Sequence, residues 1–77
     1  MRNVRLLTRG PLDGQDARNV MNFIEESFDL GETDTQIGRG LHVLLAPRQV
    51  KLWRDGVGAL CVLVDQPAES SEATGRR

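Results

Sequence analysis

The sequence lacks most of the residues on which enzyme chemistry and covalent cross-links depend. It contains one cysteine, one histidine, one tryptophan and no tyrosine among 77 residues. A lone cysteine cannot form a disulfide within the chain, and one histidine with one cysteine cannot supply the four ligands of a usual zinc site. A zinc site could exist only if it were shared across a symmetric dimer. We therefore expect neither a bound metal nor a cofactor.

Long hydrophobic runs are also missing. The longest, VGALCVLV at residues 57–64, is far shorter than the roughly 20 residues of a membrane-spanning helix. The first ten residues, MRNVRLLTRG, lack the apolar stretch of a signal peptide. We therefore expect a protein of the reducing cytoplasm with no membrane partner.

Few residues could act as a nucleophile. Ser27 or Cys61 could in principle pair with His42, but Ser27 falls in a predicted helix and Cys61 in an apolar predicted strand. A helix-surface hydroxyl and a small core residue are the simpler interpretations, and a packed or exposed side chain is the simpler one for His42. The sequence thus predicts no catalytic residues and a protein that is not an enzyme.

Two short segments resemble ligand loops without matching them. The acids of DLGETD lack the D-x-D-x-D-G spacing of a calcium loop. The glycines of IGRG fit neither G-x-G-x-x-G nor G-K-[ST], so they more simply let the chain bend and leave Arg39 exposed. We keep Arg39 as a candidate loop contact to a carboxylate or phosphate, because its guanidinium is fork-shaped.

One helix is clearly predicted over residues 14–30. Asp13 is a suitable N-cap, and Gly31 occupies the position of a left-handed C-cap. The helix carries one apolar stripe, as expected when a single face packs on a sheet. The stripe consists of Ala17, Val20, Met21, Ile24 and Phe28.

Four strands are predicted around this helix, giving the order β-α-β-β-β within a single α+β domain at residues 1–65. One helix would pack on one face of a four-stranded, mainly antiparallel sheet. Residues 31–40 are predicted to be a long loop, and the polar residues 66–77 a disordered C-terminal tail. The strands are predicted at residues 2–9, 41–46, 48–54 and 57–65.

The last strand is apolar on both faces, which favours a central position between the third strand and the first. If the helix covers one face, the opposite face carries Arg5, Leu7, Arg9, Lys51 and Trp53. One alternating set of the last strand joins them, either Ala59, Cys61 and Leu63 or Leu60, Val62 and Val64. With the first set, the predicted sheet-face interface is Arg5, Leu7, Arg9, Lys51, Trp53, Cys61 and Leu63.

Charge is distributed unevenly along the chain. Residues 13–34 hold seven acids and one base, a charge of −6, and the rest holds nine bases and four acids, a charge of +5. Acids on an exposed helix usually form a solvated face, but regularly spaced acids can also occupy a basic groove of another protein. The candidate partner-binding acids are Glu25, Glu26, Asp29, Glu32 and Asp34.

These features favour a small protein-binding module, most simply an inhibitor or regulator of a larger complex that handles nucleic acid. In its size, its lack of motifs and its acidic face, the chain is similar to phage-encoded inhibitors such as anti-CRISPR proteins, although no residue pattern is diagnostic of them. The sheet face would bind another protein or form a homodimer.

Two alternatives stay open. One is a structural subunit of a phage particle or another assembly. The other is a small nucleic-acid-binding regulator, which a net charge of −1 and a single aromatic residue on the face do not favour. That regulator would use Arg5, Arg9, Lys51, Trp53 and Arg39.

Overall fold

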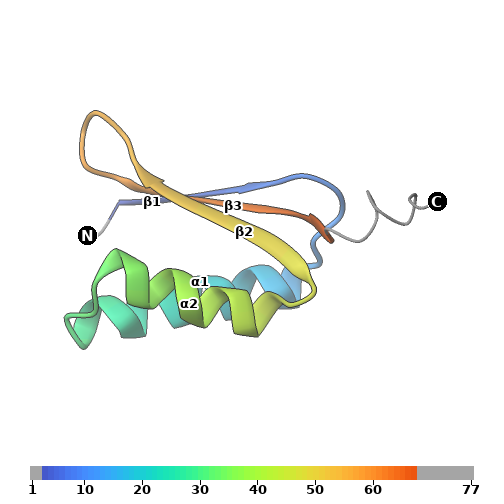
Figure 1. The fold of residues 1–77 in the computed structure, drawn as a ribbon, viewed down its shortest axis with the longest axis horizontal. Helices are drawn as coiled ribbons and strands as arrows, with labels where there is room; N and C mark the ends of the chain where they lie inside the picture. Colours follow the sequence, from blue (N-terminus) through green and yellow to red (C-terminus); the bar gives the residue numbers. More distant parts are fainter. Residues whose placement is uncertain (1–2, 68–77) are drawn as a thin grey trace.

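The computed structural model describes residues 3–67 and consists of two layers, a three-stranded sheet and two helices that lie on one of its faces (Figure 1). The α+β class is confirmed. The predicted β-α-β-β-β order and the predicted four-stranded sheet are wrong, because the order is β-α-α-β-β. The elements are β1 (Val4–Thr8), α1 (Gly14–Asp29), α2 (Asp34–Leu45), β2 (Arg48–Arg54) and β3 (Leu60–Pro67).

The caps of α1 match the sequence prediction. The side chain of Asp13 accepts a hydrogen bond of 2.8 Å from the backbone N–H three residues later. At the other end, Gly31 has a φ of +74° and donates to the carbonyl of Phe28 at 3.0 Å. Glu32 donates to the carbonyl of Ser27 at 3.0 Å, which completes a Schellman motif. Both ends of α1 are therefore fixed by local chemistry.

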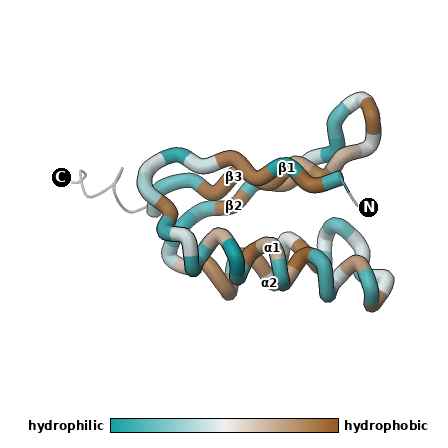
Figure 2. The backbone as a smooth tube through the Cα atoms, turned by 180° about the vertical axis from the view of Figure 1, so that it is seen from behind, coloured by the Kyte–Doolittle hydropathy of each residue, from teal (hydrophilic) through white to brown (hydrophobic). Residues whose placement is uncertain are grey.

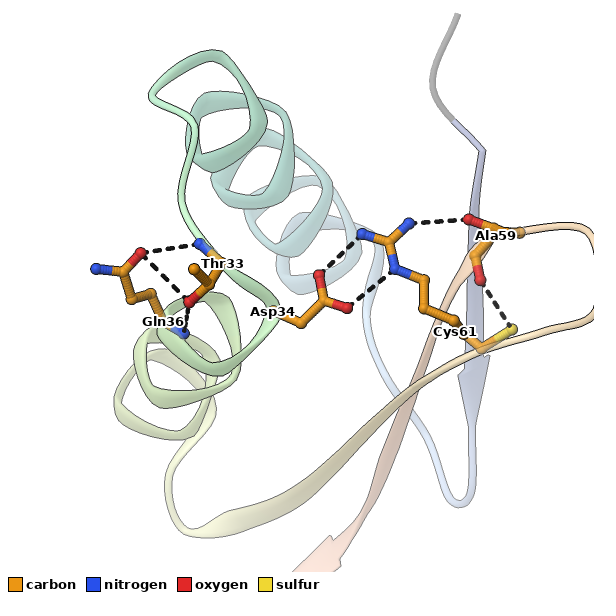
Figure 3. A network of polar contacts seen from close by, with 7 residues as sticks. Thr33, Asp34, Gln36, Ala59 and Cys61 are labelled. Atoms are coloured by element: carbon orange, nitrogen blue, oxygen red, sulfur yellow. Dashed lines mark hydrogen bonds and ion pairs between the residues drawn. The ribbon is translucent and has the colours of Figure 1, made fainter.

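The second helix, α2, occupies residues that were predicted as a loop (31–40) and a strand (41–46). Its N-terminus is a capping box, in which the Thr33 hydroxyl accepts from the Gln36 backbone at 3.2 Å and the Gln36 side chain accepts from the Thr33 backbone at 2.8 Å (Figure 3). Ile37, Leu41 and Leu45 are buried at a spacing of four residues, which places them on one face of a helix with 3.6 residues per turn.

The two glycines of α2 misled the sequence prediction, since glycine lowers helix propensity. Gly40 has a packing reason to be glycine, because a Cβ at that position would overlap the ring of Phe23 on α1. The absence of a side chain there lets the two helices approach closely.

The sheet has the order β1-β3-β2, with β1 parallel and β2 antiparallel to β3. The central position predicted for the last strand is confirmed, whereas the mainly antiparallel character is wrong because one of the two pairings is parallel. Strand β3 continues to Pro67, so residues 66 and 67 are not part of a tail. The remainder of the predicted tail lies outside the described residues.

The core lies between the sheet and the helix pair. Leu60, Val62 and Val64 point toward the helices and have no exposed surface. Figure 2 shows hydrophobic segments on both layers, and within residues 3–67 no further element lies on the outer side of the sheet. The core cluster comprises Val20, Ile24, Ile37, Leu41, Leu45, Val50, Leu60, Val62 and Val64.

Candidate functional site

The outer face of the sheet, which we call the sheet face, brings together residues from all three strands. Because the set of Leu60, Val62 and Val64 faces the helices, Cys61 and Leu63 belong to the outer side. Cross-strand register arranges the face in two rows. One row is Arg5, Cys61 and Trp53, and the other is Leu7, Leu63 and Lys51.

Apolar surface is exposed on this face. Trp53 is 43% exposed and Leu7 is 46% exposed, although both are large hydrophobic residues. Cys61 is only 3% exposed, because it is a small residue between two long side chains of its row. Its thiol donates to the Ala59 carbonyl at 3.9 Å (Figure 3), so Cys61 is the packed core-type residue that its sequence context predicted.

The positive charges on β1 and directly after it are balanced by acids of the same chain. A nitrogen of Arg5 lies 3.6 Å from a carboxylate oxygen of Asp55, and a nitrogen of Arg9 lies 3.5 Å from a carboxylate oxygen of Asp65. With Lys51, three bases and two acids lie on or beside the face, a net charge of +1. The face therefore attracts anions only weakly.

Asp55 also holds the hairpin that joins β2 to β3. Its carboxylate accepts hydrogen bonds of 2.9 Å from the backbone N–H groups of Ala59 and Val57, and these bonds lower the pKa of Asp55, with a smaller contribution from Arg5. Gly58 has a φ of +86°, as the residue after a type I turn does in a hairpin with a bulge. The residues RDGVG thus form the tight turn of this hairpin, closed by a hydrogen bond of 3.1 Å from the Gly58 N–H to the Asp55 carbonyl.

The acidic residues lie in the helix layer, on the other side of the molecule from the sheet face. Glu25, Glu26 and Asp29 belong to α1, and Glu32 lies in the turn before α2. Glu26 and Asp29 are exposed, and Glu25 and Glu32 are half-buried. The structure therefore gathers four of the five predicted acids around the end of α1.

Asp34, the fifth predicted acid, pairs within the chain. Its two carboxylate oxygens accept from the guanidinium of Arg54 at 2.8 and 2.9 Å, and the same guanidinium donates to the Gly58 carbonyl at 2.9 Å (Figure 3). The hydrogen bonds from Arg54 lower the pKa of Asp34. This pair ties the start of α2 to the end of β2. Sequence reasoning missed it because the partners are separated by 20 residues.

Arg39 is not a loop residue. It is exposed on α2 and lines a shallow groove between the two helices, together with Phe23, Glu26 and Glu32. The five residues of the predicted nucleic-acid surface are therefore not all together, since Arg39 lies in the helix layer and the other four on the sheet face.

The residues weighed as catalytic lie in different environments. His42 is exposed on α2 rather than on a strand, and Ser27 is buried, with 3% exposure, rather than on the helix surface. Cys61 lies on the sheet face, so the sheet stands between it and the helices. Cys61 and His42 are therefore not placed to act as a nucleophile and its base.

Comparisons with known proteins give no family to which the chain can be assigned. No family model matches it, and no curated protein or solved structure matches it significantly. Within residues 3–67, no group of three or more histidine, cysteine, aspartate or glutamate side chains is placed to hold a metal ion. In the same part of the chain, no helix has the length and apolarity needed to cross a membrane. The sheet face and the acidic end of α1 are therefore the candidate binding surfaces of the described residues.

Proposed function

We propose that this chain is a small non-enzymatic protein-binding module that inhibits or regulates a larger complex handling nucleic acid. The observation that carries the proposal is the sheet face, where Trp53 and Leu7 are almost half exposed and no element of residues 3–67 covers them. Tryptophan and arginine are the residues most enriched at the energetic centres of protein interfaces. An apolar centre with a polar edge is also the usual composition of such interfaces.

The charges of the sheet face favour a protein partner over nucleic acid. Arg5 and Arg9 each lie within 3.6 Å of an aspartate, so their charges are already compensated. Proteins that bind single strands combine an uncompensated basic groove with several stacking aromatics. Here Trp53 is the single tryptophan of the chain, and the face has a net charge of only +1.

The acidic end of α1 supports the inhibitory part of the proposal. Glu25, Glu26, Asp29 and Glu32 lie in the helix layer, so a target could bind there while the sheet face is occupied. Closely spaced carboxylates can compete with phosphates for a basic groove, and such a contact weakens as salt screens it. The target would then be a nucleic-acid channel of another protein.

Affinity capture with matched variants tests the sheet face. Leu7→Lys places a charge on the sheet face, whereas Val43→Lys makes the corresponding change on α2, where Val43 is 82% exposed. Both sites are exposed, so both variants should keep the circular dichroism spectrum of the wild type. We expect the captured partner to be retained by Val43→Lys and lost by Leu7→Lys. Equal capture by the two variants would refute the proposed docking surface.

A further inference from the structure

Each row of the sheet face has different side chains at its two ends, and a second copy of the chain can place its own side chains opposite them. In one row Arg5 on β1 and Trp53 on β2 lie at opposite ends, with the small Cys61 between them on the central strand. In the other row Leu7 and Lys51 occupy the ends, with Leu63 between them. Each row therefore pairs a β1 side chain with a chemically different β2 side chain.

We infer that a second copy of this chain covers the sheet face, forming a twofold-symmetric dimer in which the two sheets pack face to face. The inference rests on the proposed function, because it names the occupant of the same surface. A twofold axis along β3 exchanges the sheet edges, so β1 of one copy lies over β2 of the other. Face-to-face sheets keep their strands within about 30° of each other, which this axis allows.

In both rows, this axis places the β1 side chain of one copy over the chemically different β2 side chain of the other. Arg5 of each copy lies over Trp53 of the other, where a guanidinium on an indole face gains a cation–π interaction. Leu7 of each copy lies over the aliphatic part of Lys51 of the other. A twofold axis across the strands would instead place β1 over β1 and bring Arg5 close to Arg9 of the second copy. That arrangement loses both contacts between Arg5 and Trp53, which disfavours it.

Charge balance also favours a second copy. Because Arg5 and Arg9 are paired with Asp55 and Asp65, each face has a net charge of only +1. Two such faces can meet with little net repulsion. A strongly acidic or strongly basic partner would gain little from the same face.

The size of the face sets the expected strength of the dimer. Three strands about 4.8 Å apart, each contributing about five residues at roughly 3.3 Å per residue, give a footprint of roughly 250 Å². Stable interfaces bury about 800 Å² per partner, so even with its side chains this face is small. We therefore expect a dimer that exchanges with the monomer at micromolar concentrations rather than a permanent one.

The chain carries its own probes for this interface. Trp53 is the only tryptophan and Lys51 is the only lysine, and both lie on the sheet face. Burial of Trp53 would shift its fluorescence emission to shorter wavelength. Since each chain has one lysine, a cross-link between two Lys51 peptides can form only between two copies.

The test measures molecular mass by sedimentation equilibrium and Trp53 emission from about 5 to about 500 µM, a range that covers dissociation constants in the micromolar region. For the wild type we expect the mass to rise from 8.5 kDa toward twice that value. The emission of Trp53 should move to shorter wavelength with the same midpoint concentration. Val43→Lys should behave identically, and Leu7→Lys, which places a second positive charge against Lys51 of the other copy, should remain a monomer with long-wavelength emission. An amine-reactive cross-linker should yield the Lys51 to Lys51 product in the wild type.

Two results would overturn the inference. One is a wild-type mass of a single chain at every concentration. The other is a dimer that persists equally in Leu7→Lys, which would place the interface elsewhere. A monomeric wild type that still captures a partner, lost by Leu7→Lys and kept by Val43→Lys, would refute the second copy but leave the proposed function intact.

Discussion

Gly38 and Gly40 lie two residues apart in α2, yet replacing each with alanine should change stability in opposite directions. Both replacements gain up to about 1 kcal/mol from helix propensity. At Gly38 the new Cβ would lie 3.8 Å from a methyl carbon of Leu52, an ordinary contact, so Gly38→Ala should stabilise the fold by up to about 1 kcal/mol. At Gly40 the new Cβ would overlap the Phe23 ring, and overpacking costs about 1–3 kcal/mol. We expect Gly40→Ala to be destabilised by about 1 kcal/mol overall.

Urea unfolding followed by circular dichroism at a single protein concentration measures both variants. For a domain of this size, 1 kcal/mol also corresponds to roughly 4–8 °C in Tm. Repeating Gly40→Ala in a Phe23→Leu background should remove most of its penalty, because the ring that the Cβ would overlap is gone. If Gly40→Ala stabilised the protein as much as Gly38→Ala, the close approach of the helices at Phe23 would be refuted.

Three further predictions concern the ion pair of Asp34, the capping box of α2 and the acidic end of α1. Asp34→Asn should lower the free energy of unfolding at pH 7 by a few tenths to about 1 kcal/mol, since the pair is solvent-exposed. The folded pKa of Asp34 lies below its ordinary 3.8, so this contribution is present above about pH 4 and disappears as pH falls through the folded value. Urea midpoints of wild type and variant should therefore converge in acid, and a constant gap down to pH 2 would contradict the assignment. Thr33→Ala should lose about 1 kcal/mol with its cap, while the exposed Thr35→Ala should change little, and equal losses would argue against the capping box. Glu26→Lys combined with Asp29→Lys should weaken target capture and flatten its salt dependence without changing the mass of the dimer, and unaltered capture would exclude the acidic contact.

The helices show how far local sequence signals reach. The helix α1 was predictable because Asp13, Gly31 and the apolar stripe all lie within it or next to it. The signals for α2 were also local, namely the Thr33 to Gln36 capping box and the four-residue spacing of its buried residues. They were outweighed by Gly38 and Gly40. At Gly40 the packing of Phe23 explains the choice of residue, and no local pattern could indicate that contact.

Those features of the sheet that follow from the residue pattern of one strand were predictable. Residues 59–64 are apolar on both faces, which placed β3 in the centre. Alternation along β1 and β2 then assigned Arg5, Leu7, Lys51 and Trp53 to one face without any knowledge of register. The number of strands was not predictable in this way, since residues 41–46 are a short apolar run that fits a buried strand or a buried helix equally well.

The acidic surface was predictable only as a set of charges. Sequence indicates that Asp34 is negative, but its role depends on Arg54, which reaches it only after α2 and β2 have packed. The same limit applies to Arg5 and Arg9, whose aspartate partners lie 50 and 56 residues further along the chain. Charge counted along a sequence therefore overestimates the charge that a partner meets on the surface.

The second helix leaves the outer face of the sheet uncovered within residues 3–67. A second helix could have covered the outer face of the sheet, but α1 and α2 lie side by side on the same face (Figure 1). The reason is width, because three strands at about 4.8 Å span roughly 15 Å with their side chains, and one helix with its side chains is only about 10 Å wide. Both helices are therefore needed to bury Leu60, Val62 and Val64. The outer side chains of the sheet, Trp53 among them, can be covered only by something outside residues 3–67.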